Sequence, residues 1–142
     1  MIAGRGTAPH NGGDQNIGFE MGTLMAHLGT LHSFVLDCPD PRALAEFYRG
    51  LVGGTIQADG DDWVDLRIDG IGAKLSFQQS PGYAAPVWPS DDGDQQAHLD
   101  IAVPDLAGAH DDVLALGARH IESHDTFRVY LDPVGHPFCT VV

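Results

Sequence analysis

Apolar residues recur along this chain at two spacings, and the spacings follow each other in the same order in its two halves. Each half opens with a short apolar run, at 31–36 or 97–103, and continues with apolar residues three or four positions apart. Alternation every second residue is typical of strands, and a spacing of three to four is typical of helices. Each half therefore predicts a strand, a helix and three further strands. These later strands are expected at 54–59, 62–69, 73–79, 118–123, 126–131 and 136–142.

Capping residues mark where the two predicted helices begin and end. In the first half Asp40 is a suitable N-cap, and Pro41 suits the first helical position, where an N–H group is not needed. Gly53 ends this helix, and Asp105 and Gly117 take the same roles in the second half. The apolar stripes that result contain Leu44, Phe47, Tyr48 and Leu51 in the first helix and Leu106, Ala109, Val113 and Leu116 in the second.

The two halves repeat one βαβββ plan. A histidine opens each copy, His32 or His98, and an Asp-x-x-Gly turn beginning at Asp69 or Asp132 precedes each last strand. One copy is too small to bury its own apolar face, so the two must pack together. The sequence thus predicts an α+β fold in which helices cover the outside of a curved sheet. In that fold His32 and His98 occupy matching positions around a shared interior.

Length and composition fit a single domain of this kind. A chain of 142 residues lies near the commonest domain size. Residues 1–29 show neither spacing and are rich in glycine and small polar residues, which predicts a flexible tail. We expect one domain over 30–142, with modules at 30–79 and 95–142. The linker at 80–94 contains prolines and an acidic run, which favour a solvated loop.

Alternation divides each predicted strand into two faces. We expect the more apolar set of side chains to lie under the helix and the more polar set to line the open side. A concave side lined by polar and aromatic groups suits a small organic molecule, although an open sheet can also present a polar face to water and bind nothing. The residues predicted to line the ligand pocket are Phe34, Trp63, Asp65, Arg67, Ser76, Asp100, Arg128 and Tyr130.

The net charge of −13 narrows the range of partners. Only 7 lysines and arginines are present, which argues against binding to nucleic acid or to an anionic membrane surface. No stretch approaches the roughly 20 apolar residues that span a bilayer. The charge favours a cationic ligand, for which Asp65 and Asp100 supply charge and Trp63 and Trp88 supply cation–π contact.

The cysteines and the N-terminal sequence bear on the cellular compartment. Cys38 and Cys139 occur one in each half, which does not suggest a disulfide framework and favours a reducing compartment. The N-terminus shows no secretory signal pattern. We therefore expect a cytoplasmic protein.

Two segments resemble one known family. The strand His98-Leu99-Asp100-Ile101-Ala102-Val103, followed by Asp105 and its helix, is similar to the vicinal oxygen chelate superfamily, the glyoxalase, bleomycin-resistance and extradiol-dioxygenase group. The closing segment 132–139, Asp-Pro-Val-Gly-His-Pro-Phe-Cys, shares the resemblance, and 75–78 fits its glyoxalase-like subgroup. The resemblance covers about 30–142. It implies paired βαβββ modules that form an eight-stranded cup, and a homodimer, because many relatives build their cups across subunits.

The resemblance also implies a divalent metal, since members of the superfamily take ligands from the opening and closing strands of their modules. The opening-strand ligands carried over are His32 and His98. The closing positions fall on Cys139 and, in the first half, on Ser76 or Gln78, where the family's usual carboxylate is absent. The metal-binding set implied is His32, His98, Gln78 and Cys139. The thiolate in this set favours Zn, and Ni, Mn and Fe are the other ions considered.

Two classes of function stay open at this point, so the sequence leaves undecided whether the chain is an enzyme. The first is a metal-free binding protein that sequesters a drug or metabolite without turnover. The second is a metal-dependent lyase or isomerase of the glyoxalase type, acting on a vicinal-oxygen substrate. A third, ring cleavage with Fe(II), normally requires a carboxylate beside two histidines. A nucleophilic hydrolase and a nucleotide-binding enzyme are disfavoured, because the chain contains no Gly-x-Ser-x-Gly elbow and no phosphate loop after a strand.

Overall fold

The computed structural model describes residues 28–90, 92–94 and 96–142, so residues 1–27 of the predicted tail lie outside the described residues. The α+β class and the two βαβββ modules are confirmed, and the six later strands lie inside their predicted ranges. The first module consists of β1 (Ser33–Cys38), α2 (Pro41–Val52), β2 (Thr55–Ala58), β3 (Trp63–Arg67) and β4 (Lys74–Gln79). The second consists of β5 (Leu99–Ala102), α3 (Leu106–Ala115), β6 (Arg119–Ser123), β7 (Phe127–Leu131) and β8 (Pro137–Val141).

Each module forms its own four-stranded sheet. The strand orders are β1-β4-β3-β2 and β5-β8-β7-β6, and the same order in both confirms the internal repeat. The opening strand of each module runs parallel to the closing strand, and the other pairs are antiparallel. The opening strands β1 and β5 are edge strands within these two sheets. The eight strands of one chain thus form two four-stranded sheets, one in each module.

The helices begin at the predicted caps. The Asp40 carboxylate accepts a hydrogen bond from the backbone N–H of Ala43 at 3.1 Å, and the C-cap of α2 is Gly53, whose φ of 75° suits glycine. The Asp105 carboxylate accepts hydrogen bonds from two backbone N–H groups at the start of α3. In the part of the chain that the structure describes, no helix is long and apolar enough to cross a membrane.

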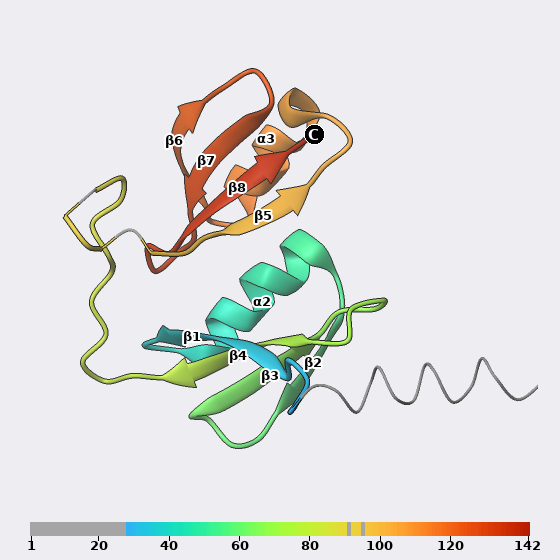
Figure 1. Ribbon diagram of the computed structural model, residues 1–142, viewed down its shortest axis with the longest axis vertical. Helices are drawn as coiled ribbons and strands as arrows, with labels where there is room; N and C mark the ends of the chain where they lie inside the picture. Colours follow the sequence, from blue (N-terminus) through green and yellow to red (C-terminus); the bar gives the residue numbers. More distant parts are fainter. Residues whose placement is uncertain (1–27, 91, 95) are drawn as a thin grey trace, which may run out of the picture. The chain divides into compact units, whose positions relative to one another are not determined.

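One core serves both modules because α2 contacts both sheets. The Tyr48 ring stacks on Phe77 of its own sheet at 5.7 Å between ring centroids, and the Phe47 ring meets Phe138 of the second sheet at 5.8 Å. Figure 1 shows α2 lying between the two sheets. The helix-bearing faces therefore meet in the centre of the domain. The shared interior predicted around His32 and His98 does not form within one chain, since the open faces point away from this core.

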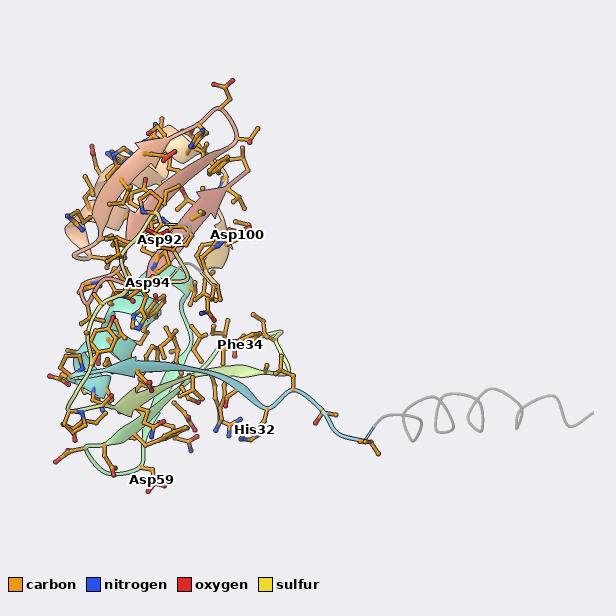
Figure 2. The ribbon with its side chains drawn as sticks, turned by 60° about the vertical axis from the view of Figure 1, so that its left-hand side comes forward. His32, Phe34, Asp59, Asp92, Asp94 and Asp100 are labelled. Carbon is orange, nitrogen blue, oxygen red and sulfur yellow. The ribbon has the colours of Figure 1, made fainter. Side chains whose placement is uncertain are left out.

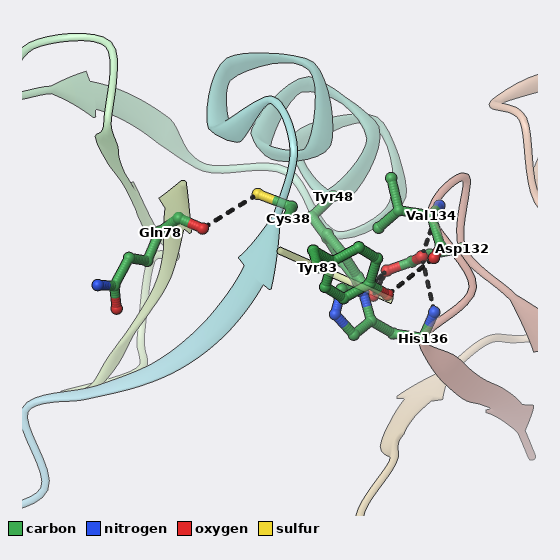
Figure 3. Close-up of polar contacts among 7 residues, drawn as sticks. All are labelled: Cys38, Tyr48, Gln78, Tyr83, Asp132, Val134 and His136. Carbon is green, nitrogen blue, oxygen red and sulfur yellow. Dashed lines mark hydrogen bonds and ion pairs between the residues drawn. The ribbon is translucent and has the colours of Figure 1, made fainter. Parts of the chain in front are cut away.

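A buried carboxylate ties the second module to α2 (Figure 3). The side chain of Asp132 is fully buried, and its Oδ1 accepts the backbone N–H groups of Val134 and His136 at 3.0 and 2.9 Å. Its Oδ2 accepts the Tyr48 hydroxyl at 2.8 Å and lies 2.7 Å from Nδ1 of His136. Burial, together with the Asp132 charge, raises the pKa of Tyr48 and keeps its hydroxyl a donor. Tyr83 of the linker joins this group by donating to the Val134 carbonyl.

Candidate functional site

Strand register decides which predicted site residues share a face, because paired residues point to the same side of a sheet. In the first module Asp65 pairs with Ser76, and Trp63 pairs with Gln78. Their neighbours Val64 and Leu66 are buried under α2. The predicted open-face set of β3 and β4 is therefore confirmed as a set of neighbours. Arg67 shares the face by alternation and donates from Nε to the side chain of Gln57 at 3.0 Å.

The polar residues at the centre of this face are bound to one another. Asp65 accepts hydrogen bonds from Trp63 Nε1 at 2.8 Å and from Ser76 Oγ at 2.7 Å, and it forms an ion pair with Lys74. Burial opposes ionisation of Asp65, but the hydrogen bonds from Lys74, Ser76 and Trp63 outweigh it and lower the pKa of the carboxyl group. The negative charge of Asp65, which the sequence analysis assigned to binding a cationic ligand, is thus balanced by Lys74.

This cluster predicts a pH-dependent stability. Because the folded protein lowers the pKa of Asp65, its contribution is present above the ordinary carboxyl pKa of about 3.9 and is lost as pH falls through the lower folded value. At pH 7, Asp65→Asn is expected to reduce the free energy of unfolding by about 1–2 kcal/mol. Urea unfolding at pH 7 and pH 3 should show this difference shrinking in acid. The exposed Asp111→Asn serves as the control and should show no such change.

The opening strand β1 is displaced by one residue from the predicted alignment. Phe34 pairs with Leu75, just as Leu99 pairs with Phe138, so Ser33 and not His32 is the counterpart of His98. The predicted equivalence of the two histidines is therefore wrong. Counting back seven positions from each helix cap, Asp40 and Asp105, gives Ser33 and His98.

The same register places Phe34 on the helix side of its sheet, which corrects the predicted open-face position. Phe34 stays half exposed because β1 is an edge strand. Figure 2 shows the Phe34 and His32 side chains on opposite sides of β1, with His32 directed away from Asp100 of the second module. The two histidines do not share a hollow in this chain.

In β7 the two faces are the reverse of the prediction. Val129 pairs with Cys139 on the open side, whereas Tyr130 pairs with Phe138 on the helix side. Tyr130 is fully buried, and its hydroxyl lies 2.8 Å from Nδ1 of His110 on α3. The predicted open-face positions of Tyr130 and Arg128 are therefore wrong. Tyr130 fits the core because its buried hydroxyl has a hydrogen-bond partner.

The open face of the second module carries a hollow of about 470 Å³. Asp100 pairs with Cys139 across β5 and β8, and His98 projects from the same side of the chain two residues earlier. The Trp88 ring lies 5.6 Å from the His98 ring. Phe127 and Val129 were not predicted to line the hollow, because the predicted faces of β7 are the reverse of the observed ones. The hollow is lined by Trp88, His98, Asp100, Thr126, Phe127, Val129, Cys139, Val141 and Val142.

Three metal-ligating side chains converge in this hollow. Donor atoms of His98, Asp100 and Cys139 lie within 4.8 Å of one another, and His98 Nε2 is 3.3 Å from Asp100 Oδ1. Burial, followed by the charge of Asp100 and a hydrogen bond to it, raises the pKa of Cys139 to about 11. The metal-free side chain is thus a neutral thiol and a poor nucleophile at neutral pH.

The structure brings together two of the four residues implied as metal ligands. His98 and Cys139 belong to the cluster, whereas His32 and Gln78 belong to the first module. At the first-module positions that correspond to His98 and Cys139 stand Ser33 and Ser76. Asp100 was assigned to the ligand pocket alone, although alternation places it on the same face as His98.

Comparisons with known proteins agree with this architecture. A family model described as a glyoxalase-like domain matches residues 33–141. No curated protein sequence matches the chain.

Solved structures with the same fold differ strongly in sequence. A possible glyoxalase from Bacillus cereus matches with a TM-score of 0.59 at 16% identity, covering 82% of this chain and 100% of that one. A glyoxalase/bleomycin resistance protein/dioxygenase family enzyme from Burkholderia phytofirmans PsJN matches at 0.61 and 16%, covering 80% and 100%. TnmS3, an antibiotic-binding protein from Streptomyces sp. CB03234, matches at 0.55 and 16%, covering 80% and 95%. At this identity the likeness shows the fold alone.

Proposed function

Because this chain belongs to the glyoxalase-like domain family, we propose that it binds a small organic molecule on the open face of its second module and holds it without turnover. The observation that carries the proposal is the hollow between Trp88 and Phe127, with Asp100 at its polar side. Its volume of about 470 Å³ lies within the range of roughly 300–1,000 Å³ typical of ligand sites. TnmS3, which shares the fold, is an antibiotic-binding protein.

The alternative is a metal-dependent lyase or isomerase, and one observation favours it, the proximity of His98 and Cys139. The two-module ligand set that the family implies does not fit this chain, however. Ser33 replaces the first-module histidine, and Ser76 at the closing position is buried and donates its hydroxyl to Asp65. The proposed function therefore does not rely on a metal held between the two modules.

Electrostatics favour a cationic aromatic ligand. The Asp100 side chain is 57% exposed, and among the residues that the structure describes it has no lysine or arginine partner. The chain's net charge of −13 adds a long-range attraction for cations. Trp88 offers an aromatic face for cation–π contact beside this carboxylate.

We further propose that the protein works as a homodimer in the cytoplasm. The open faces point away from the core, so a second subunit is needed to cover them. Phe34, Val35 and Ile71 remain exposed, and Phe34 and Ile71 line a mostly apolar hollow of about 460 Å³ that also involves β5. Exposed apolar surface of this kind is typical of protein interfaces. The free thiols of Cys38 and Cys139 are consistent with a reducing compartment.

Titration of the protein into 9-aminoacridine, a planar basic aromatic compound that is itself fluorescent, tests the proposal through the rise in fluorescence anisotropy of the bound compound. Asp100→Asn and Trp88→Leu should each weaken binding about tenfold, the effect of about 1.4 kcal/mol. Asp111→Asn, an exposed acid on α3, is the matched control and should bind normally. Equal affinity in all four proteins would refute the hollow as the binding site. Sedimentation of the same samples should give twice the chain mass of 15.1 kDa.

A further inference from the structure

We infer that the second module alone forms a zinc site from His98, Asp100 and Cys139, with no ligand from the first module. The three donors lie within 4.8 Å of one another on a single sheet face. Pairing of β5 with β8 sets Asp100 directly opposite Cys139, and alternation along the chain brings His98 to the same side. The inference does not depend on whether the hollow also binds an organic molecule.

The donor types select the ion. One imidazole nitrogen, one carboxylate oxygen and one thiolate sulfur form a mixed set of the kind that zinc accepts. Magnesium and calcium require several oxygen ligands, and this site provides one carboxylate. The usual non-haem Fe(II) site requires two histidines, and the cluster contains His98 alone. On binding, Cys139 coordinates as the thiolate and its proton passes to solvent.

The geometry requires only a small adjustment. Tetrahedral zinc with bonds of about 2.0–2.3 Å places its donors roughly 3.3–3.6 Å apart. The separation of 3.3 Å between His98 Nε2 and Asp100 Oδ1 already meets this spacing. Cys139 is held in the buried centre of the sheet, whereas the side chains of His98 and Asp100 are 40% and 57% exposed and free to turn toward its sulfur.

Three protein ligands leave zinc one open coordination position. The hollow that contains these residues is lined on its other sides by Phe127, Val129 and Trp88, so this position is available to water or to a donor atom of a small ligand. An oxygen or nitrogen donor is the chemical class expected there. Since zinc would occupy Asp100 and add positive charge, zinc and a cationic aromatic compound should compete.

Cobalt titration of the reduced full-length chain tests the site, because tetrahedral Co²⁺ reports its own ligands. We expect one Co²⁺ per chain, a thiolate-to-cobalt charge-transfer band, and loss of that band when Zn²⁺ is added. Cys139→Ser should abolish the band, and His98→Ala and Asp100→Asn should each weaken binding at least tenfold. The matched controls are Cys38→Ser, which changes the other buried cysteine, and His32→Ala, which changes the first-module histidine. Both should behave as the wild type.

Several outcomes would overturn the inference. The first is a lack of stoichiometric Co²⁺ or Zn²⁺ binding. The second is a charge-transfer band that is lost in Cys38→Ser but kept in Cys139→Ser. The third is a loss of metal affinity in His32→Ala as large as that in His98→Ala. The variants at His98 and Asp100 alter exposed side chains and keep the fold, so unchanged affinity in both would be equally decisive.

Competition separates this inference from the proposed function. Binding of 9-aminoacridine without metal binding would refute the zinc site alone, and metal binding without 9-aminoacridine binding would refute the proposed function alone. If both bind, Zn²⁺ should lower the affinity for 9-aminoacridine at least tenfold in the wild type.

Discussion

Asp132→Ala is expected to lower the free energy of unfolding by about 3–5 kcal/mol, the range for removing one partner from a buried charged network. The variant leaves the Tyr48 hydroxyl without its acceptor and frees two backbone N–H groups of the β7–β8 turn. Unsatisfied donors of this kind are costly because burial has already removed their water. Tyr48 lies on α2 and Asp132 follows β7, so the loss also weakens the contact between modules.

Urea unfolding followed by circular dichroism checks this prediction. Asp69→Ala is the matched control, because Asp69 occupies the same place in the first Asp-x-x-Gly turn but is exposed. It should cost less than about 1 kcal/mol. Asp132→Asn, which keeps one acceptor oxygen, should fall between the two. A similar small loss for Asp69→Ala and Asp132→Ala would show that the network contributes little to stability.

Local signals in the sequence were sufficient for the elements. The caps Asp40 and Asp105 act within one helical turn, and so a single sequence carries them in full. The strands of the first module alternate cleanly, with Val64 and Leu66 apolar between polar neighbours. For this reason the faces of β3 and β4 were predicted correctly.

Signals that depend on partners in space were not visible in the sequence. Tyr130 resembles an open-face residue until His110 of α3 is known to lie beside its hydroxyl. Val129 resembles a core residue, yet it lies on the open side, where it is buried beside Cys139 in the floor of the hollow. Polarity alone therefore assigned both faces of β7 in reverse.

The His32 error had a different cause, because the information was present in the sequence. Aligning the modules by their histidines gave weight to a residue type, whereas the distance to the helix cap is fixed by backbone geometry. The cap-based count identifies Ser33, and the register of β1 with β4 agrees. This one-residue shift turns the side chain to the opposite face. It accounts for the prediction of a shared two-histidine hollow that the chain does not form.

The way in which the modules pack was also beyond the sequence. The stripe of the first helix was predicted to cover its own sheet, and Tyr48 does so by stacking on Phe77. Its neighbour Phe47 faces the second module, where it meets Phe138. The apolar stripe of α2 is wide enough to contact two surfaces. The sequence does not indicate which surface Phe47 contacts, since any apolar face in the chain would fit it.

This shared core leads to the second prediction, that Phe138→Ala lowers the free energy of unfolding by about 3–5 kcal/mol. Phe138 is fully buried, and its ring contacts Tyr130 in its own sheet and Phe47 on α2. Removing the ring leaves a cavity where the modules meet, and relaxation of only one module cannot fill it. The midpoint of urea unfolding should fall by roughly 2 M, given a slope of about 1–3 kcal/mol per M.

Val87→Ala is the control, because it removes apolar atoms from a linker position that is 65% exposed and should cost about 1 kcal/mol or less. A core that belongs to both modules also requires them to unfold together. In a Trp88→Phe background, fluorescence of Trp63 reports on the first module, and its transition should coincide with that of circular dichroism in the parent and in Phe138→Ala. A first module that keeps its stability while Phe138→Ala unfolds the second would show that the two cores are independent.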